Sequence, residues 1–333
     1  MKSGKLKVGV VGTGHLGSLH AKMYAQISAC DLVGVFDVQS ERAERIAAEL
    51  NTKAFVTLEE LLDDVDAVSV VSVTKQHYDI SRRALAHGKH LFIEKPITET
   101  IEQARELVSV ARAGNLKIQV GHIERFNPAV LAVEPYAIKP LFIESHRLAQ
   151  FNPRGSDVAV VLDLMIHDID LILSLVKSPV ERIDANGVAV VSDSIDIANA
   201  RIQFQNGCVA NVTASRVSQN KMRKMRLFQQ DAYISIDFAQ GLAEVFSLVD
   251  EGTTHIAPTM MLGKIEQGSR KRVIVYEQPE VKEVNALKYE LELFVHAAQS
   301  NEEPKVTGED GLQALEVAQV ILSKIQNQKI HSL

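Results

Sequence analysis

The first 121 residues alternate short apolar runs with amphipathic stretches. This alternation is typical of a parallel sheet that carries helices on both faces. It predicts a doubly wound α/β domain of the Rossmann type with six strands and intervening helices such as Glu41 to Leu50 and Ile101 to Ala113. The predicted strands are Leu6 to Val11, Leu32 to Asp37, Ala54 to Phe55, Ala67 to Val73, His90 to Glu94 and Lys117 to Gly121.

From residue 122 to residue 333 the pattern changes to successive apolar-polar strands, which predicts an α+β domain with a large, mostly antiparallel, open-faced sheet. Asn206-Gly207 indicates a hairpin with a primed turn between two of these strands. Two late helices are predicted, Ala286 to Gln299 and Gly311 to Ile325, and packing of these helices against the first domain is one expectation for them. The predicted strands are Phe142 to Leu148, Val188 to Val191, Ile195 to Phe204, Cys208 to Ser215, Met225 to Gln229, Tyr233 to Asp237, Leu242 to Leu248 and Arg272 to Tyr276.

A Gly-x-Gly-x-x-Gly string follows the first predicted strand and precedes a helix. In this setting Gly12 permits a tight turn, Gly14 lets the backbone approach a pyrophosphate, and Gly17 lets the helix pack close to the strand. His15 and Leu16 open that helix, whose first amides bind anions. The string therefore predicts a dinucleotide site, although glycines also gather in turns that bind nothing.

An acidic residue ends the second predicted strand, where a carboxylate accepts hydrogen bonds from an adenosine ribose. This residue is Asp37, and its charge favours NAD over NADP because a 2′-phosphate would meet a negative group. Arg42 or Arg45 remains close enough in sequence to offset that charge. A Rossmann-like domain with an empty crevice is the plain alternative.

Composition narrows the class of protein. Hydrophobic residues make up 46% and charged residues 23%, as in a soluble globular protein, and the net charge of −6 argues against a general nucleic-acid binder. Cys30 and Cys208 lie outside any Cys/His cluster, which favours inert thiols in a reducing cytoplasm and no metal site. We also expect no signal peptide and no membrane-spanning segment.

A mostly apolar helix is predicted from Val158 to Leu175, with Gly155-Ser156-Asp157 as a plausible cap. Asp163, His167 and Asp170 recur on it at i, i+4 and i+7 and so share one face. A histidine beside carboxylates can take a proton near neutral pH, as alcohol oxidation requires. A satisfied internal hydrogen-bond network and a metal site are the alternatives that this spacing leaves open.

Glu94-Lys95-Pro96 ends the fifth predicted strand, at the edge of the sheet where ligands bind. The Lys95 ammonium can hydrogen-bond a substrate hydroxyl and stabilise alkoxide character, and Pro96 fixes the turn, with a cis bond as one way to do so. The alternative is a solvated lysine at a strand end beside a helix-starting proline.

These motifs together resemble the Gfo/Idh/MocA family of NAD(P)-dependent oxidoreductases over essentially the whole chain. The resemblance implies an NAD-binding domain at 1–121 and a substrate-binding and oligomerisation domain at 122–333. It implies that Lys95 polarises the reacting hydroxyl, that His167 is the general acid/base and that Asp163 supports substrate binding. The expected cofactor contacts are Gly12, Gly14, His15, Leu16, Gly17, Asp37, Thr74, His77, Glu94 and Lys95.

The polar connector after the last Rossmann strand resembles the subgroup that oxidises the 3-hydroxyl of UDP-N-acetylglucosamine. In that subgroup an aminotransferase acts next on the ketone. Arg125, Arg147, Arg154 and the basic run Lys221 to Arg226 have the charge to bind a diphosphate, and a solvated strand edge explains that run equally well. The expected substrate contacts are His122, Glu124, Arg125, Asn127, Arg154, Asp163 and His167.

Three alternatives to this function stay open. In two of them the enzyme oxidises another substrate, either a free polyol such as inositol or a UDP-linked uronic acid. In the third the chain is a nicotinamide-binding redox regulator without turnover. Family resemblance also implies a homodimer or homotetramer formed through the second sheet. It implies a small-molecule substrate and neither a nucleic-acid nor a membrane partner.

Overall fold

A computed structural model describes residues 4–152, 158–250, 259–267 and 270–330. The chain divides into two compact units, Met1–Ile123 with Asn285–Glu316, and Glu124–Val284 with Val317–Leu333. A functional boundary at residue 121 stays a prediction. In the described ranges, no helix has the length and apolar character needed to cross a membrane.

The first unit is built on a six-stranded parallel sheet of order β3-β2-β1-β4-β5-β6. Its chain order reverses between β1 and β4, which in such sheets marks the ligand crevice at the carboxyl ends of the strands. This confirms the predicted Rossmann fold. The strands are β1 (Leu6–Val11), β2 (Cys30–Phe36), β3 (Lys53–Ala54), β4 (Ala67–Val70), β5 (His90–Glu94) and β6 (Ile118–Gly121).

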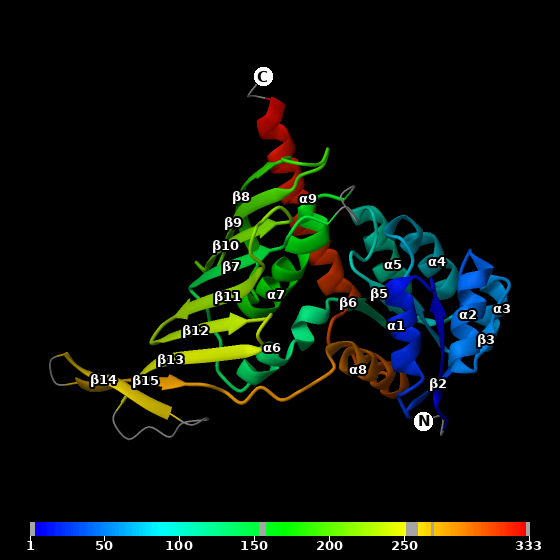
Figure 1. Cartoon of the computed structure of the whole chain (residues 1–333), viewed down its shortest axis with the longest axis horizontal. Helices are drawn as coiled ribbons and strands as arrows, with labels where there is room; N and C mark the ends of the chain where they lie inside the picture. The colour runs from blue at the N-terminus through cyan, green and yellow to red at the C-terminus, as the bar shows by residue number, and fades with distance from the viewer. Residues whose placement is uncertain (1–3, 153–157, 251–258, 268–269, 331–333) are drawn as a thin grey trace. The chain divides into compact units, whose positions relative to one another are not determined.

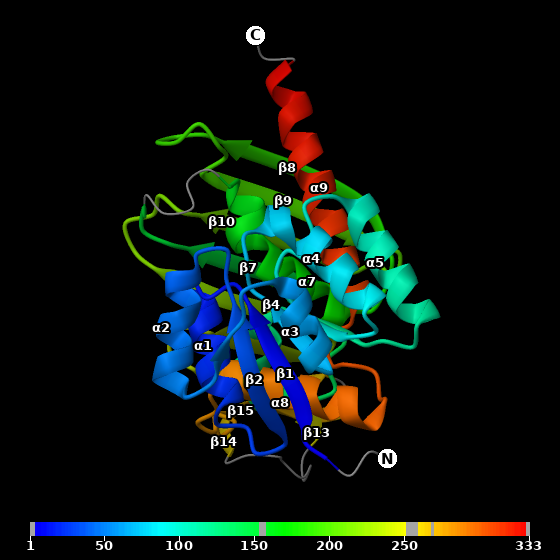
Figure 2. The ribbon, with the colours of Figure 1, turned by 90° about the vertical axis from the view of Figure 1, so that its right-hand side faces the viewer.

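Helices cover both faces of this sheet (Figure 2). One face carries α1 (His15–Tyr24), α2 (Ser40–Leu50) and α8 (Ala286–Ser300), and the other carries α3 (Leu58–Asp64), α4 (Thr74–Ala86) and α5 (Ile101–Ala113). From the late part of the chain, α8 contributes Leu291, Phe294 and Val295 to the core beneath α1. Burying such side chains supplies most of the stability of this unit.

The second unit is built on a nine-stranded mixed sheet of order β14-β15-β13-β12-β11-β7-β10-β9-β8. Among the described strands of this sheet only the β7–β10 pair is parallel, so the predicted mostly antiparallel sheet is confirmed. The strands are β7 (Phe142–Leu148), β8 (Val180–Val188), β9 (Ile197–Phe204), β10 (Val209–Ser215), β11 (Met222–Gln229), β12 (Ala232–Asp237), β13 (Leu242–Asp250), β14 (Thr259–Gln267) and β15 (Arg270–Glu277).

Helices of the second unit cover one face of its sheet, where α6 (Pro128–Val133) and α7 (Ile166–Val176) lie (Figure 1). They pack on buried strand residues such as Ile143, Val212 and Leu227. On the other side of the sheet the strands expose alternate side chains, and Figure 1 draws no described helix there. We call this side the open face. The division of the chain into two units falls within α9 (Gly308–Ile330), between Glu316 and Val317.

Several local predictions in the second unit were wrong or incomplete, and most of β8 was missed. Val188 to Val191 is not a strand, because β8 ends at Val188 and the amides of residues 190, 191 and 192 donate to one carboxylate oxygen of Asp196. β14 was missed, since Gly263 and a register shift break its alternation. In the hairpin after β9 only Gly207 has a positive φ, 85°, whereas a type I′ primed turn needs two such residues.

Both cysteines are buried and free. Burial raises the pKa of the Cys30 thiol and of the Cys208 thiol to about 11 in each case. Thiols with so high a pKa carry little thiolate at neutral pH and are poor nucleophiles and metal ligands.

Candidate functional site

Three glycines shape the end of β1 in the way that the sequence predicts. Gly12 has φ 92°, and a Cβ there would lie 2.7 Å from the Val71 carbonyl oxygen. A Cβ on Gly17 would lie 1.8 Å from the Gly12 oxygen, so the helix packs directly on the turn. A Cβ on Gly14, in contrast, would have no heavy atom within 4 Å. The backbone at Gly14 therefore faces open space, as expected of a backbone that receives a ligand.

A cavity of about 340 Å³ lies against this turn within the first unit. Gly14 is the N-cap of α1, and no side chain caps that helix, so its first amides have no side-chain acceptor. Amides at a helix N-terminus bind phosphate well. The lining includes Gly12, Gly14, His15, Leu16, Asp37 and Arg42, together with Val38, Val73 and Gln76. The lining residues therefore fit a dinucleotide.

Asp37 is held by Thr13, a residue that sequence reasoning passed over as the first variable position of the fingerprint. The backbone N–H and hydroxyl of Thr13 donate to Asp37 Oδ2 at 2.6 and 3.1 Å, and the Gln39 N–H donates to Oδ1 at 2.9 Å. Thr13 is fully buried. These donors fix the carboxylate beside the cavity in one orientation.

The predicted contacts on α4 differ in exposure. Thr74 is half-buried and is the first residue of α4, the helix that follows β4. His77 is buried, and its two ring nitrogens lie 3.0 Å from the carbonyl oxygens of Pro96 and Ser72. Burial lowers the pKa of His77, although both carbonyls favour the charged ring. A neutral ring has one N–H and donates it to one of these carbonyl oxygens, while its other nitrogen lies against the second.

Glu94 and Lys95 follow β5 at the carboxyl edge of the sheet. Glu94 is buried, accepts from the Lys95 N–H at 3.2 Å, and contacts His20 Nε2 at 3.1 Å. Lys95 is half-buried, and the Lys95–Pro96 peptide bond is cis, as one prediction for Pro96 allowed. The turn places a lysine side chain on the same strand edge as the glycine turn of β1.

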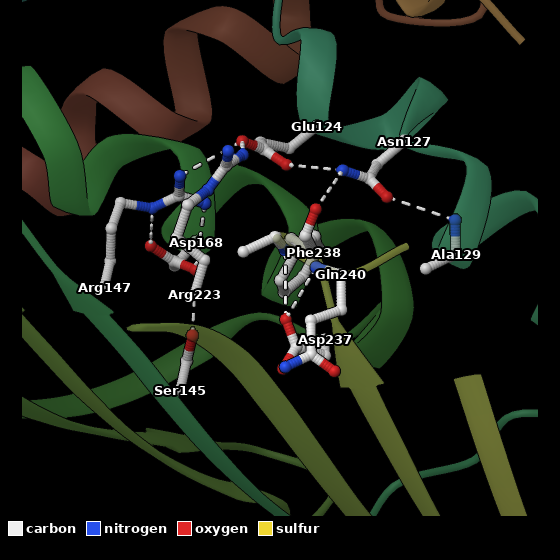
Figure 3. A network of polar contacts seen from close by, with 11 residues as sticks. Glu124, Asn127, Ala129, Ser145, Arg147, Asp168, Arg223, Asp237, Phe238 and Gln240 are labelled. Carbon is white, nitrogen blue, oxygen red and sulfur yellow. Dashed lines mark hydrogen bonds and ion pairs between the residues drawn. The ribbon is translucent and has the colours of Figure 1, made fainter. Parts of the chain in front are cut away.

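In the second unit, a buried ionic network joins the start of that unit to β7, β11 and α7 (Figure 3). Glu124 contacts Arg147 at 3.0 Å and also contacts Arg223. Arg147 and the Ser145 hydroxyl both donate to Asp168, at 2.6 and 2.8 Å. Burial opposes the charge of Arg147, but Asp168 and Glu124 outweigh it and raise the pKa of the guanidinium. Two of the predicted ligand-binding side chains, Glu124 and Arg147, thus have buried protein partners.

The other residues of the connector also have protein contacts. Asn127 caps α6 by accepting from the Ala129 N–H, and its amide lies 3.4 Å from Glu124 and from the Phe238 oxygen. Arg125 binds Asp170. His122 is completely buried. Their side chains hold the local structure, and direct contact with a substrate stays a prediction for each of them.

The basic run lies on β11, whose cations meet carboxylates of neighbouring elements. Lys224 contacts Asp237 at 3.1 Å and Arg226 contacts Glu144 at 2.8 Å. β11 lies between β7 and β12, so its interpretation as a strand edge was wrong. Arg154, and the cap predicted at 155–157, fall outside the described residues.

Asp163 and His167 lie where a π-helical turn, η2 (Val161–Met165), leads into α7. The prediction of one continuous helix was therefore wrong at its start. Both side chains are half-buried, whereas Asp168 and Asp170 on the same helix are buried in ion pairs. π-Helical turns are frequent at functional sites. Of the predicted stripe, Asp163 and His167 are therefore the half-buried members and Asp170 the buried one, and a catalytic role for the first two stays a prediction.

Comparison with known proteins gives consistent matches. Residues 6–122 match the oxidoreductase family with an NAD-binding Rossmann fold, and residues 101–235 match the GFO/IDH/MocA C-terminal domain. The chain is 43% identical over 242 residues to UDP-N-acetylglucosamine 3-dehydrogenase of Acidithiobacillus ferrooxidans, an alignment that spans 72% of this chain and 77% of that protein.

Solved structures agree over nearly the full length. A structure of the same Acidithiobacillus ferrooxidans enzyme matches with a TM-score of 0.86 and 35% identity, covering 97% of this chain and 98% of that one. Myo-inositol 2-dehydrogenase of Thermotoga maritima is 25% identical over 93% of each chain. A Lactobacillus casei scyllo-inositol dehydrogenase with bound NAD(H) and scyllo-inositol has a TM-score of 0.76 at 24% identity, over 97% of this chain and 98% of that one, which supports the fold.

Proposed function

The chain belongs to the GFO/IDH/MocA family of oxidoreductases, and on that basis we propose that it oxidises the 3-hydroxyl of UDP-N-acetylglucosamine to a ketone. Its class is NAD-binding dehydrogenase acting on CH–OH groups. The observation that carries the proposal on substrate is the 43% identity to an enzyme of that name over 77% of its length. Inositol dehydrogenases that match the chain are less similar, at 25 to 31% identity.

Residues of the first unit have the binding part in this proposal. The uncapped N-terminus of α1 and the open space at Gly14 would receive a pyrophosphate, and Asp37 would accept from ribose hydroxyls. When bound, the nicotinamide supplies the acceptor for a hydride. Thr74, His77 and Glu94 shape the same strand edge. Because Asp37 is negative, we propose NAD rather than NADP as the cofactor.

Three residues, Lys95, His167 and Asp163, act on the sugar in this proposal. Lys95 donates a hydrogen bond to the reacting hydroxyl oxygen and stabilises the negative charge that develops there. His167 accepts the hydroxyl proton, and Asp163 binds the sugar. Among the other predicted substrate contacts, Arg125 is ion-paired with Asp170 and Glu124 with Arg147. Because these pairs are buried, Arg125 and Glu124 support the substrate site indirectly, by holding these partners in place.

A free polyol, or a UDP-linked uronic acid, is the rival substrate within the same family, and a redox regulator without turnover is the rival of another class. Dependence on the UDP group separates the free polyol from the UDP-linked sugars, and the sugar itself separates the two UDP-linked substrates. Reduction of NAD is therefore compared with UDP-N-acetylglucosamine, free N-acetylglucosamine, UDP-glucuronic acid and myo-inositol. Turnover only with the first supports the proposal, and faster turnover with either of the last two contradicts it.

We also propose a homodimer or homotetramer that forms through the open face. Five aromatic residues stand directly opposite one another on β7, β11, β12, β13 and β15 of this face, with ring centroids 5.0 to 6.0 Å apart. A continuous aromatic row of this kind is more typical of an interface than of a solvated surface. The row is Phe142, Phe228, Tyr233, Phe246 and Tyr276.

A further inference from the structure

Two buried histidines hold the Glu94-Lys95-Pro96 turn from opposite faces of the parallel sheet. His20, on α1, contacts the Glu94 carboxylate at 3.1 Å. His77, on α4, contacts the Pro96 carbonyl oxygen at 3.0 Å. Helices α1 and α4 cover different faces of the sheet (Figure 2). Lys95 therefore stands between two residues that are each bound to an imidazole.

The hydrogen bond of His20 has a defined direction. Its side chain is completely buried and packs edge-on against Phe92, with ring centroids 5.2 Å apart. Nδ1 of His20 has no hydrogen-bond partner in the described residues, and Nε2 faces the carboxylate. A proton on Nδ1 would leave a buried N–H without an acceptor and the Glu94 carboxylate without this donor. A proton on Nε2 leaves only the Nδ1 lone pair without a partner, which costs less free energy. Nε2 of His20 therefore carries a proton and donates it to Glu94.

Glu94 transmits this contact to the lysine. Its second carboxylate oxygen accepts from the Lys95 backbone N–H at 3.2 Å. Gly121 on the adjacent strand closes the remaining side, because a Cβ there would lie 2.7 Å from Glu94 Oε1. The carboxylate has almost no room to move, so the backbone from which the Lys95 side chain starts is fixed.

His77 fixes the other end of the turn. It bridges the Pro96 carbonyl and the Ser72 carbonyl, which lies after β4. Ser72 lines the proposed cofactor cavity, so His77 connects that cavity to the turn, and His20 lies on α1, whose N-terminus lines the same cavity.

We propose that His20 and His77 are positioning residues that hold Lys95 in place for proton and hydride transfer. This inference rests on the proposed role of Lys95. His20 acts through the Glu94 carboxylate, and His77 acts through the backbone of Pro96. Neither residue is required to touch the substrate.

The test uses three variants on α1. His20→Leu removes the donor and keeps an apolar side chain, His20→Gln restores an N–H donor, and Tyr24→Phe is the control. Tyr24 is buried one turn further along the helix and bonds Ser69 on β4 at 2.8 Å, and within the described residues it makes no hydrogen bond to Glu94, Lys95 or Pro96. We expect His20→Leu to lower kcat by about 100-fold, the size of effect that a misplacement of about 1 Å produces. His20→Gln recovers most of the loss, and Tyr24→Phe keeps wild-type kcat.

A double variant separates positioning from general damage. If His20 acts through Lys95, adding His20→Leu to Lys95→Met lowers the residual rate by no more than about twofold, because residues that act as a unit are not additive. A second readout needs no turnover. The ¹³Cε resonance of Lys95 in lysine-labelled protein, assigned by its loss in Lys95→Met, should shift in His20→Leu and His77→Gln and stay in Tyr24→Phe.

Each result decides one claim. Wild-type kcat and an unmoved Lys95 resonance in His20→Leu overturn the positioning role and leave the proposed function standing. An equal loss in the wild-type and Lys95→Met backgrounds also overturns it, since it indicates structural damage. Full turnover in Lys95→Met overturns the proposed role of Lys95 instead and leaves the proposed reaction standing, and the resonance then still reports whether His20 positions Lys95.

Discussion

The guanidinium of Arg125 donates to both carboxylate oxygens of Asp170, three residues beyond His167 on α7, at 2.8 and 2.6 Å. Both side chains are nearly excluded from water. Sequence reasoning gave Arg125 to the substrate and put Asp170 on the catalytic face. The pair instead ties the connector after β6 to the helix that carries His167.

Breaking this buried pair should destabilise the protein strongly. Asp170→Asn leaves the buried Arg125 charge uncompensated, which costs about 3 kcal/mol or more of unfolding free energy. The matched control is Asp184→Asn, whose partner Arg182 is exposed and bonds it at 2.9 Å, with an expected cost below about 1 kcal/mol. Urea denaturation of both variants measures the difference. Equal costs would mean that the Arg125 pair does not hold α7.

Gly14→Ala should separate cofactor binding from folding. A Cβ at residue 14 meets nothing, so the midpoint of thermal unfolding without cofactor stays at the wild-type value. NAD must approach this backbone, so its dissociation constant should rise by at least about tenfold. Calorimetric titration with NAD checks this. Gly17→Ala is the contrasting variant, because its Cβ would overlap the Gly12 oxygen and should lower stability itself. Unchanged NAD binding in Gly14→Ala would remove the pyrophosphate from this turn.

Asp37→Asn should reduce discrimination between the two cofactors. It removes the charge that repels a 2′-phosphate and keeps an oxygen for the Thr13 donors. We expect the preference for NAD over NADP, taken as the ratio of dissociation constants, to fall by at least about tenfold. Arg42→Ala in the same background tests whether the arginine beside the cavity binds the added phosphate. A ratio that Asp37→Asn leaves intact would place the choice of cofactor elsewhere.

His77 should make stability depend on pH in the weakly acidic range. Burial lowers its pKa from the usual 6.5 in the folded state, so the unfolded chain binds more protons below that pH. Its contribution is complete above about pH 6.5 and is lost as the pH falls through the unfolded value towards the lower folded value. Denaturation curves between pH 7 and pH 5 should therefore decline less steeply for His77→Gln. Parallel curves for the two proteins would contradict a depressed pKa.

The aromatic row on the open face should hold copies of the chain together. Phe246→Asp puts a charge in the middle of the row, and sedimentation should then give a mass near that of one chain, 36.7 kDa, in place of two or four. Val56→Asp, at a highly exposed position of the first unit, is the control and should not change the mass. A wild-type protein that already sediments as one chain would contradict the proposed oligomer.

Local patterns in the sequence predicted most of the fold because they are repeated in every element. The limits of β5 and of β7 agree to the residue with the prediction, and in β5 the polar His90 and Glu94 mark the two ends of an apolar run. The loop that binds Asp196 could not be predicted, because its amides choose a carboxylate several residues away over a neighbouring strand. The π-helical turn before His167 likewise leaves no signal in an evenly apolar stretch.

Site residues divide in the same way. Gly12 and Gly17 could be assigned from spacing alone, since their chemistry is set by adjacent backbone. The partners of Arg147 and Arg125 could not, because Asp168 and Asp170 are distant in sequence and meet them only after folding. A basic side chain reads as a ligand contact until its carboxylate is known. His20 carried a weaker signal, a histidine on an apolar helix face, which is common in folded cores.

The most direct test of the proposed function is to trap the oxidised sugar. The protein is incubated with NAD and UDP-N-acetylglucosamine in the presence of a carbonyl-trapping reagent, and the sugar is analysed by mass spectrometry. We predict a trapped ketone two hydrogens lighter than the substrate, with the ketone at position 3, and its loss in His167→Ala. No trapped product, in a protein that still binds NAD, would contradict this substrate. Full product formation by His167→Ala would contradict the assigned base.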